Sequence, residues 1–539
     1  MNHSCFGVAA TIAVSLGLPQ IGAAQGWMSY GGNSQHTAMH AAASSVMQKI
    51  LWSAPLDDQR SYYGSEVLIH YASPVITPSN TVVHSYRFTT PGPKYDNWRV
   101  IGRSGVSGRQ IWALATDYSA PLVDPGGGNS NDWTSVYPLC LTGSNTVAAG
   151  AGGGTVLFRT SGDAVSSPVK RVSFYSAYDD YTQNPSSFAN IKICTPLTGD
   201  SKGNVYFGYM VNGSVPGSVS AALGSGGVAR VGSNGKVLFK NMSELAVDAS
   251  RPALNSAPAL SNDGKSLYVG VVGGSLHYLV KLDTTTFLKQ ASAPVMDPQA
   301  NQGAGLIDQS SAAPMVGPDG HVFCGVFGYN YRESHGWLLQ FDANLNPKNS
   351  KGQTWPAGAF GWDDTPSIVP ANIVASYRGK ATYLLLCKYN NYSLGSGDGK
   401  NRVAVLDPTS NSVTRDRQSG IPVMNEVITV LGPTPNVEEG GVCEWCINSA
   451  AIDVAKKSAL INSEDGHCYR WNFTTNKLQE AVSLAPATGE AYTSTAIGPN
   501  GSGYFINNSI LFAIGAGGGS SGPSGPLAFR TFRPRSKSD

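Results

Sequence analysis

The sequence is poor in charged residues and shows no long amphipathic helical pattern. Only 13% of its 539 residues are Asp, Glu, Lys or Arg, and Lys plus Arg total 37 against 35 for Asp plus Glu. Because a protein that binds nucleic-acid phosphates needs a basic surplus, we expect no nucleic-acid partner. The chain is rich instead in turn formers, with 63 glycines and 32 prolines. This composition favours many short strands joined by tight turns.

Long hydrophobic runs are also scarce. The stretch from Cys5 to Ile21 is apolar and is followed by three small residues, which is typical of a signal peptide over residues 1–24. This pattern predicts a secreted or periplasmic protein. No later segment approaches the ~20 apolar residues of a membrane span, so none is expected. At the other end, residues 516–539 are Gly/Ser/Pro-rich and basic, and we predict a disordered tail there.

The sequence does contain an internal repeat. Residues 256–269 and 312–323 show it best: a small residue and Pro, a few apolar residues, an Asp-Gly turn, then a β-branched and aromatic run. Each copy predicts an inner strand, a hairpin turn and a second strand. Eight copies align on Pro74, Pro138, Pro196, Pro258, Pro314, Pro366, Ala451 and Ala496. Their unequal spacing suits four-stranded propeller blades with variable loops.

We therefore predict one all-β domain over residues 25–515, an eight-bladed β-propeller of four-stranded antiparallel blades. The last unit has only three evident strands after Tyr492. Residues 49–56 are expected to supply its fourth strand by pairing near residues 504–514, which would leave no open blade edge. The ring would then be closed by its own N-terminal strand, and we expect a monomer.

Several phrases resemble the pyrroloquinoline-quinone-like β-propeller superfamily. These are the opening residues 27–37, the run Ile50-Leu51-Trp52, and blade phrases such as residues 108–112. The resemblance covers nearly all of the chain after residue 24. It implies the propeller fold, but not one function, because the superfamily includes quinone-dependent dehydrogenases and a non-catalytic scaffold of the outer-membrane barrel-assembly machine.

Polar and aromatic residues gather in the loops that lead into the predicted inner strands. Such loops converge over one mouth of a propeller's central channel, which makes them candidates for a binding site. The predicted ligand-binding residues are Trp133, Lys192, Arg251, Asn255, Asp308, Trp362, Asp363, Asp364, Glu444, Trp445, Asn448 and Glu490. Tyr71, Tyr137, Gln309 and Tyr492 lie in the same loops. Alternatively, these residues only cap turns and strand ends.

The resemblance also implies a cofactor. The quinone-dependent dehydrogenases hold their quinone between a tryptophan and a disulfide of two adjacent cysteines, with calcium or a lanthanide bound by Glu, Asn and Asp. This chain has no adjacent cysteine pair, and Cys443 and Cys446 have a different spacing beside Glu444, Trp445 and Asn448. That departure argues against a quinone. Since no second Cys pair or His pair is near, a structural role for Cys443 and Cys446 is favoured.

Two other cysteines, Cys324 and Cys387, fall on predicted second strands of neighbouring blades. Facing sheets lie ~10 Å apart, whereas a disulfide needs Cα atoms within ~7 Å, so both are expected to be buried free thiols. For the whole chain, the first functional hypothesis is a propeller that binds a small-molecule, carbohydrate or protein ligand at its mouth. The second is a quinone-dependent oxidoreductase with quinone and calcium. The third is a carbohydrate-active hydrolase or lyase that uses paired carboxylates.

Overall fold

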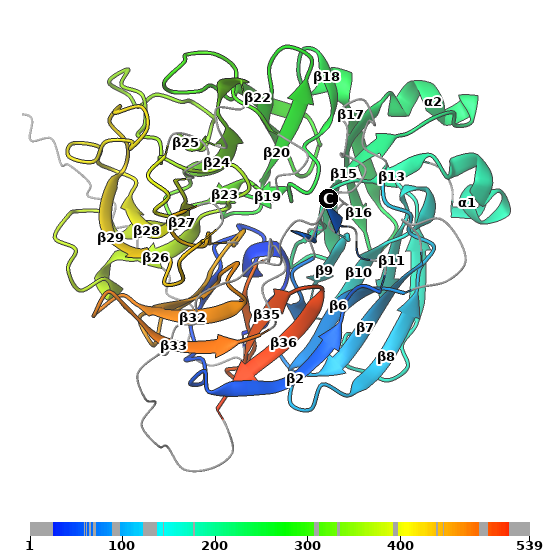
Figure 1. Ribbon diagram of the computed structural model, residues 1–539. Helices are drawn as coiled ribbons and strands as arrows, with labels where there is room; N and C mark the ends of the chain where they lie inside the picture. Colours follow the sequence, from blue (N-terminus) through cyan, green and yellow to red (C-terminus); the bar gives the residue numbers. More distant parts are fainter. Residues whose placement is uncertain are drawn as a thin grey trace, which may run out of the picture.

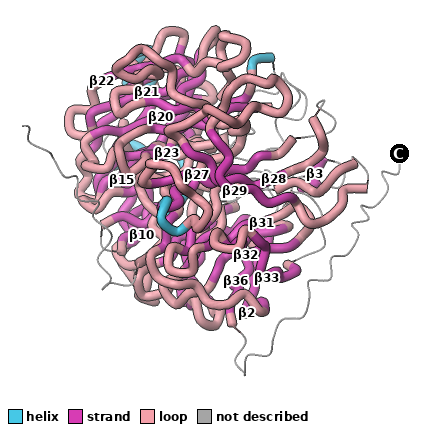
Figure 2. Tube along the Cα trace, turned by 90° about the vertical axis from the view of Figure 1, so that its left-hand side faces the viewer, coloured by secondary structure: helices cyan, strands magenta, loops and turns pink. Residues whose placement is uncertain are grey.

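The computed structural model describes residues 25–58, 60, 62–63, 66–67, 72–88, 97–121, 137–143, 145–175, 178–306, 312–330, 335–391, 397–437, 440–445, 447–484 and 494–516. Its strands form eight antiparallel blades arranged around a ring (Figure 1), as the repeat predicted. Seen from the side, the described chain is almost entirely strand and loop, with short helical segments (Figure 2). The signal peptide predicted over 1–24 and most of the tail predicted over 516–539 lie outside the described residues.

The first four blades follow one another along the chain. Blade I holds β5 (Val75–Ile76), β6 (Thr81–Arg87), β7 (Trp98–Ser104) and β8 (Gln110–Ala115). Blade II holds β9 (Leu139–Thr142), β10 (Thr146–Gly150), β11 (Val156–Arg159) and β12 (Val169–Val172). Blade III holds β13 (Ile191–Ile193), β14 (Thr198–Gly199), β15 (Asn204–Val211), β16 (Gly226–Gly232) and β17 (Val237–Asn241). Blade IV holds β18 (Ala249–Pro252), β19 (Ala259–Leu260), β20 (Ser266–Gly273), β21 (Tyr278–Asp283) and β22 (Lys289–Pro294).

The last four blades complete the ring. Blade V holds β23 (Met315–Val316), β24 (Val322–Phe327) and β25 (Gly336–Phe341), and blade VI holds β26 (Ser367–Pro370), β27 (Tyr383–Tyr389), β28 (Arg402–Asp407) and β29 (Asn425–Leu431). Blade VII holds β30 (Ala451–Asp453), β31 (Ser458–Asn462), β32 (His467–Asn472) and β33 (Lys477–Ser483). Blade VIII holds β34 (Ala496–Ile497), β35 (Gly503–Asn507), β36 (Ile510–Gly515) and β2 (Lys49–Pro55).

A few elements lie outside this plan. The helices α1 (Tyr178–Gln183) and α2 (Gly217–Leu223) belong to insertions around blade III, and β3 (Tyr62–Tyr63) pairs with β4 (Glu66–Val67). Blade V departs from the predicted four strands. Among the described residues, the outer side of β25 makes only an isolated bridge, between Leu338 and Gly358. The segment that occupies the fourth position there is therefore irregular.

The position of each strand in its blade explains its burial. Every residue of the second strands β20, β24 and β27 is buried, because neighbouring blades cover both of their faces. The outer strands β2 and β33 instead mix exposed and buried residues. Hairpins between inner and second strands use Gly264 and Gly320, whose φ angles of +68° and +86° favour glycine.

The ring closes as the sequence predicted. β2 pairs antiparallel with β36, and the register runs from Lys49 opposite Gly515 to Pro55 opposite Ile510. Figure 1 shows these two strands, from opposite ends of the described chain, side by side. The indole of Trp52 donates a hydrogen bond to the carbonyl oxygen of Gly105 at 3.0 Å, which ties blade VIII to blade I. β2 is therefore the outermost strand of blade VIII and covers the outer edge of β36.

The segment 27–40, which we call the axial floor, crosses the inner strands from blade I to blade VII. Its backbone carbonyls accept hydrogen bonds from inner-strand amides, for example Leu141 to Met28 at 2.7 Å and Ile368 to Thr37 at 2.9 Å. Further such bonds come from Ile76, Leu260, Val316 and Ile452. β1 (Met39–His40) also pairs parallel with β30. Because the free edges of inner strands face the axis, this segment must lie on the axis.

Candidate functional site

A buried group of charged residues lies where the chain enters blade VI. Asp363 and Asp364 precede β26, and Lys388 is the penultimate residue of the adjacent strand β27. The Nζ of Lys388 lies 2.6 Å from the Oδ1 of Asp363, and its backbone N–H donates to the Oδ2 of Asp364 at 3.1 Å. All three side chains are at most 1% exposed. We call Asp363, Asp364 and Lys388 the acid–base cluster.

The loop before blade VII joins this cluster. The side-chain amide of Asn448 donates to the backbone oxygen of Asp363 at 2.9 Å, and the amide of Thr365 donates to the backbone oxygen of Asn448 at 2.7 Å. Glu444 accepts a hydrogen bond from the side-chain amide of Asn390 at 3.1 Å. The starts of the inner strands of blades VI and VII are therefore held together by side chains that the sequence placed in one mouth.

Burial sets the protonation of the two aspartates. Burial raises the pKa of Asp363 to about 6, since the nearby ammonium of Lys388 only partly opposes it and the charge of Glu444 adds to it. Burial also raises the pKa of Asp364 well above its ordinary value, with Lys388 opposing and Asp363 reinforcing the shift. Because only one ammonium lies among these carboxyl groups, a state in which one carboxyl group stays protonated is favoured.

The axial floor also contacts the residues beside the acid–base cluster, through Tyr30. The hydroxyl of Tyr30 lies 3.0 Å from the Oγ1 of Thr365, which also accepts the amide of Ala313 at 2.8 Å. Burial raises the pKa of Tyr30, with the charges of Asp364 and Asp363 adding to the shift. The phenol therefore stays neutral and acts as a hydrogen-bonding group directly beside the acid–base cluster.

The aromatic residues predicted at the mouth have different positions. Trp362 is only partly buried, and its ring lies 6.0 Å from the Nζ of Lys388 and 5.1 Å from the ring of Phe327. Trp445 is fully buried in the core with Tyr469 and Ile447, so its predicted place facing the mouth is wrong. The large apolar surface of the Trp445 indole is buried between blades VI and VII. Tyr137 is likewise buried, beside Trp98 and Tyr118.

Three further predicted residues belong to blades III and IV. Lys192 lies within β13 and Arg251 within β18, so both are strand residues rather than loop residues as predicted. The inner strands of these two blades are divided, since β13 and β14 both pair with β15, and β18 and β19 both pair with β20. Asn255 is buried between β18 and β19, with a φ of +59°. The described contacts do not connect these three residues to the acid–base cluster.

The remaining predicted site residues are Trp133, Asp308 and Glu490, and they lie outside the described residues, as do Tyr71, Gln309 and Tyr492. Sequence reasoning in turn missed Lys388, Asn390 and Tyr30. A signal for Lys388 was available, because it is the one charged residue in the apolar strand Tyr383–Tyr389. A lysine is rarely buried in such a strand unless a carboxylate pairs with it.

The structure has buried free thiols at Cys324, Cys387 and Cys443. Cys324 and Cys387 are free thiols on β24 and β27, as predicted, and burial raises the pKa of each. Cys443 is also a buried thiol, and its Sγ donates to the backbone oxygen of Pro435 at 3.9 Å. Cys446, its partner in the CxxC spacing, lies outside the described residues.

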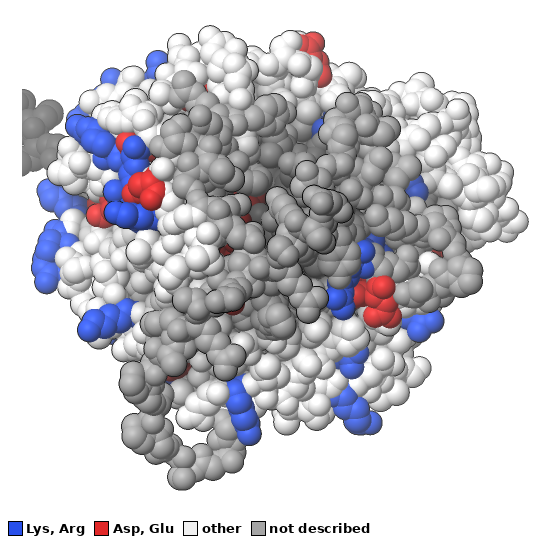
Figure 3. Space-filling model, viewed as in Figure 1, with Lys and Arg blue, Asp and Glu red and all other residues white. Residues whose placement is uncertain are grey.

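Neither a metal centre nor a membrane helix is present in the described part of the chain. Across the described ranges, no group of three or more His, Cys, Asp or Glu side chains is placed to hold a metal ion. Within the same ranges, no helix is long and apolar enough to cross a membrane. On the face shown in Figure 3, the described charged side chains of both signs are interspersed around the rim.

Among the comparisons with known proteins, the methanol dehydrogenase structure supports the fold. In sequence, the chain matches no protein-family model and no curated protein. A europium-containing methanol dehydrogenase aligns with a TM-score of 0.52 at 9% identity, covering 89% of each chain. BamB from Moraxella catarrhalis aligns at 0.41 and 11% identity over 88% of this chain and 99% of its own. With its eight closed blades, the chain therefore has the pyrroloquinoline-quinone-like β-propeller fold.

Proposed function

We propose that this protein is an exported propeller that binds a small ligand at the mouth above the acid–base cluster. The observation that carries the proposal is the buried pair of Asp363 and Lys388, with Asp364 beside it. Export rests on the apolar stretch from Cys5 to Ile21, and sequencing the N-terminus of the secreted protein tests it.

The fold does not require charges at this position. In the register of blade VI, Lys388 stands opposite Thr365, one residue before the aligned Pro366. Uncharged residues occupy the same register position in the other seven blades: Ser85, Ala151, Tyr209, Gly270, Gly325, Ile461 and Phe505. Removing charges from water costs several kcal/mol per ion. A buried charge at a register position that is uncharged in the other seven blades therefore favours a role in binding.

The residues of the mouth do not fit a quinone with calcium. Asp363 is engaged by the ammonium of Lys388, and Glu444 accepts a hydrogen bond from Asn390. Asn448 uses its side-chain amide on the backbone of blade VI. A cation would have to displace these partners, and an ammonium already supplies the positive charge. Trp445 is packed in the core and offers no open ring face for a quinone to stack on.

The carbohydrate-active alternative has one observation in its favour. A carboxyl group whose pKa lies near 6, as for Asp363, suits a proton donor close to neutral pH. If the protein hydrolyses a glycoside, Asp363→Asn should abolish turnover of a chromogenic nitrophenyl glycoside while sugar binding persists. Absence of turnover across a panel of such glycosides leaves binding as the function.

Thermal-shift and calorimetric titration test the binding proposal with defined probes. The probes are a panel of neutral mono- and disaccharides, a panel of primary amines, and pyrroloquinoline quinone with calcium. We expect binding from the saccharides only, since a protonated amine would compete with the Lys388 ammonium for Asp363, and we expect at least a tenfold loss in Asp364→Asn and Glu444→Gln. Asp263→Asn and Glu244→Gln are matched controls on exposed turns of blades IV and III. Affinity that is equal in the site variants and the controls would refute the site.

A further inference from the structure

Four buried polar side chains at the mouth ends of blades VII and VIII contain atoms without a hydrogen-bond partner. They are Ser449, Asn462, Ser494 and Asn507, and each is at most 1% exposed. The Oγ of Ser449, the Oδ1 of Asn462 and both amide atoms of Asn507 have no partner in the described structure, and the Oγ of Ser494 has none of good hydrogen-bond geometry although it lies near the Tyr30 phenol. Buried polar atoms normally find a protein or water partner, so a group of five such atoms needs an explanation.

These side chains lie close together. The amide of Thr495, next to Ser494, donates to the backbone oxygen of Ser449 at 3.1 Å. The Nδ2 of Asn462 donates to the backbone oxygen of Ile506, next to Asn507, at 3.3 Å. Thr495 also connects the two blades through its hydroxyl, which donates to the Leu460 oxygen at 2.8 Å. The partnerless atoms therefore belong to one region that spans two neighbouring blades.

This region adjoins the acid–base cluster. Ser449 and Ser494 each stand two residues before the aligned Ala451 and Ala496, whereas Asp364 stands two residues before Pro366. The two serines thus continue, in blades VII and VIII, the ring position that Asp364 fills in blade VI. Asn448, directly before Ser449, is hydrogen-bonded to the backbone of Asp363 at 2.9 Å.

We propose that Ser449, Asn462, Ser494 and Asn507 form a neutral subsite that binds hydroxyl groups. The partnerless atoms include acceptors, a donor and hydroxyls that can do both, and none of them carries charge. A hydroxyl group both donates and accepts, so it matches this set, whereas an ion would stay uncompensated. The hydroxyls come from a sugar bound at the mouth or from ordered water. The sugar source rests on the proposed function, and the water source does not.

Asn507→Leu and Ser449→Ala, made in the full chain, test the subsite. If hydroxyl groups occupy it, Asn507→Leu should lower the melting temperature, because bound hydroxyls lose their partners. If the subsite is dry, the same change should leave the melting temperature equal or raise it, because two partnerless atoms are removed. Asn401→Leu is the matched control, since its amide is satisfied by Asn391 and Val442, and it must lower the melting temperature in either case.

A crystal structure and the disaccharide titration separate the two sources. Electron density for ordered water at these atoms, with sugar affinity unchanged in both variants, supports the water source. A tenfold or greater loss of sugar affinity in Asn507→Leu and Ser449→Ala supports the sugar source. If Asp364→Asn retains sugar binding but Asn507→Leu loses it, the proposed role of the acid–base cluster in binding is refuted and the subsite proposal stands. The subsite proposal is overturned if the crystal structure shows these side chains hydrogen-bonded to other protein groups and Asn507→Leu does not lower the melting temperature.

Discussion

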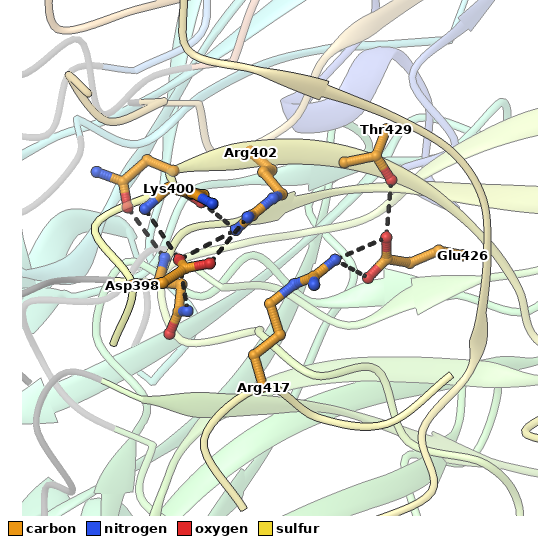
Figure 4. Close-up of polar contacts among 8 residues, drawn as sticks. Asp398, Lys400, Arg402, Arg417, Glu426 and Thr429 are labelled. Carbon is orange, nitrogen blue, oxygen red and sulfur yellow. Dashed lines mark hydrogen bonds and ion pairs between the residues drawn. The ribbon is translucent and has the colours of Figure 1, made fainter. Parts of the chain in front are cut away.

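Blade VI carries two groups of acidic and basic side chains in opposite environments. At its inner end, Asp363 and Lys388 form an ion pair that is at most 1% exposed. Toward its outer strands, Asp398 pairs with Arg402 at 3.0 Å and Arg417 pairs with Glu426 at 2.8 Å, with Thr429 donating to Glu426 (Figure 4). The Asp398 side chain is 38% exposed.

This difference in burial shifts the pKa values of the two sets of carboxyl groups in opposite directions. Partial burial alone would raise the pKa of Asp398, but hydrogen bonds from Arg402, the Lys400 amide and Asn391 outweigh it and lower the pKa to about 2. At Asp363, full burial outweighs a single ammonium and raises the pKa to about 6. An ion pair therefore stabilises a carboxylate only when its donors exceed the cost of burial. A stabilising role therefore does not explain the Asp363–Lys388 pair well.

Removal of the inner ammonium should have the largest effect. Lys388→Met leaves two buried carboxyl groups without a counter-charge, and we expect it to lower the free energy of unfolding by about 3–5 kcal/mol. Urea denaturation near neutral pH measures this loss. In the double variant with Asp363→Leu, most of the loss should be recovered, because no unpaired charge remains at that position. A loss below about 1 kcal/mol in Lys388→Met would show that water reaches the pair.

The pH dependence of the two groups should have opposite signs. Because its pKa is raised in the folded protein, protonated Asp363 stabilises the fold fully below about pH 4, and this contribution is lost as pH rises through about 6. The loss is on the order of 2–3 kcal/mol. Asp398 stabilises the fold above about pH 4 and loses this contribution as pH falls toward 2.

Melting curves of Asp363→Asn and Asp398→Asn across pH 2 to 7 measure these contributions. Asp363→Asn should flatten the profile between pH 4 and 6, and Asp398→Asn should flatten it below pH 4. If Asp363→Asn leaves the slope between pH 4 and 6 unchanged, a different group carries that dependence.

The smallest effect is expected at the outer pair. Arg402→Ala removes a partly exposed partner of Asp398, whose carboxylate keeps hydrogen bonds from the Lys400 amide and from Asn391. We expect a loss of about 0–1 kcal/mol by urea denaturation, and this loss should shrink in high salt. A cost comparable to that of Lys388→Met would remove the distinction between the two groups.

The repeat explains why the fold could be predicted so fully. Each copy fixes an inner strand, a turn and a second strand, so eight copies define eight blades whatever the loop lengths. The strand at residues 49–56 was recognisable because the last copy lacked a fourth strand, and β2 pairs with β36 as that count required. Loops that lead into inner strands must meet around the axis, which is why the sequence predicted Asp363, Asp364 and Asn448 to lie near one another, and Asn448 is hydrogen-bonded to the backbone of Asp363.

The sequence by itself determined the strand order, the closure and the loops that form the mouth, because these follow from periodicity and from the count of repeated units. Only the tertiary structure decided which side chains face one another there. Trp445 lies in the same loop as Asn448, yet contacts between blades draw its indole into the core. Lys388 and Tyr30 reach the mouth from a second strand and from the axial floor, through pairing and hydrogen bonds that join distant parts of the chain. Such contacts depend on register and on the arrangement of blades, neither of which a local pattern encodes.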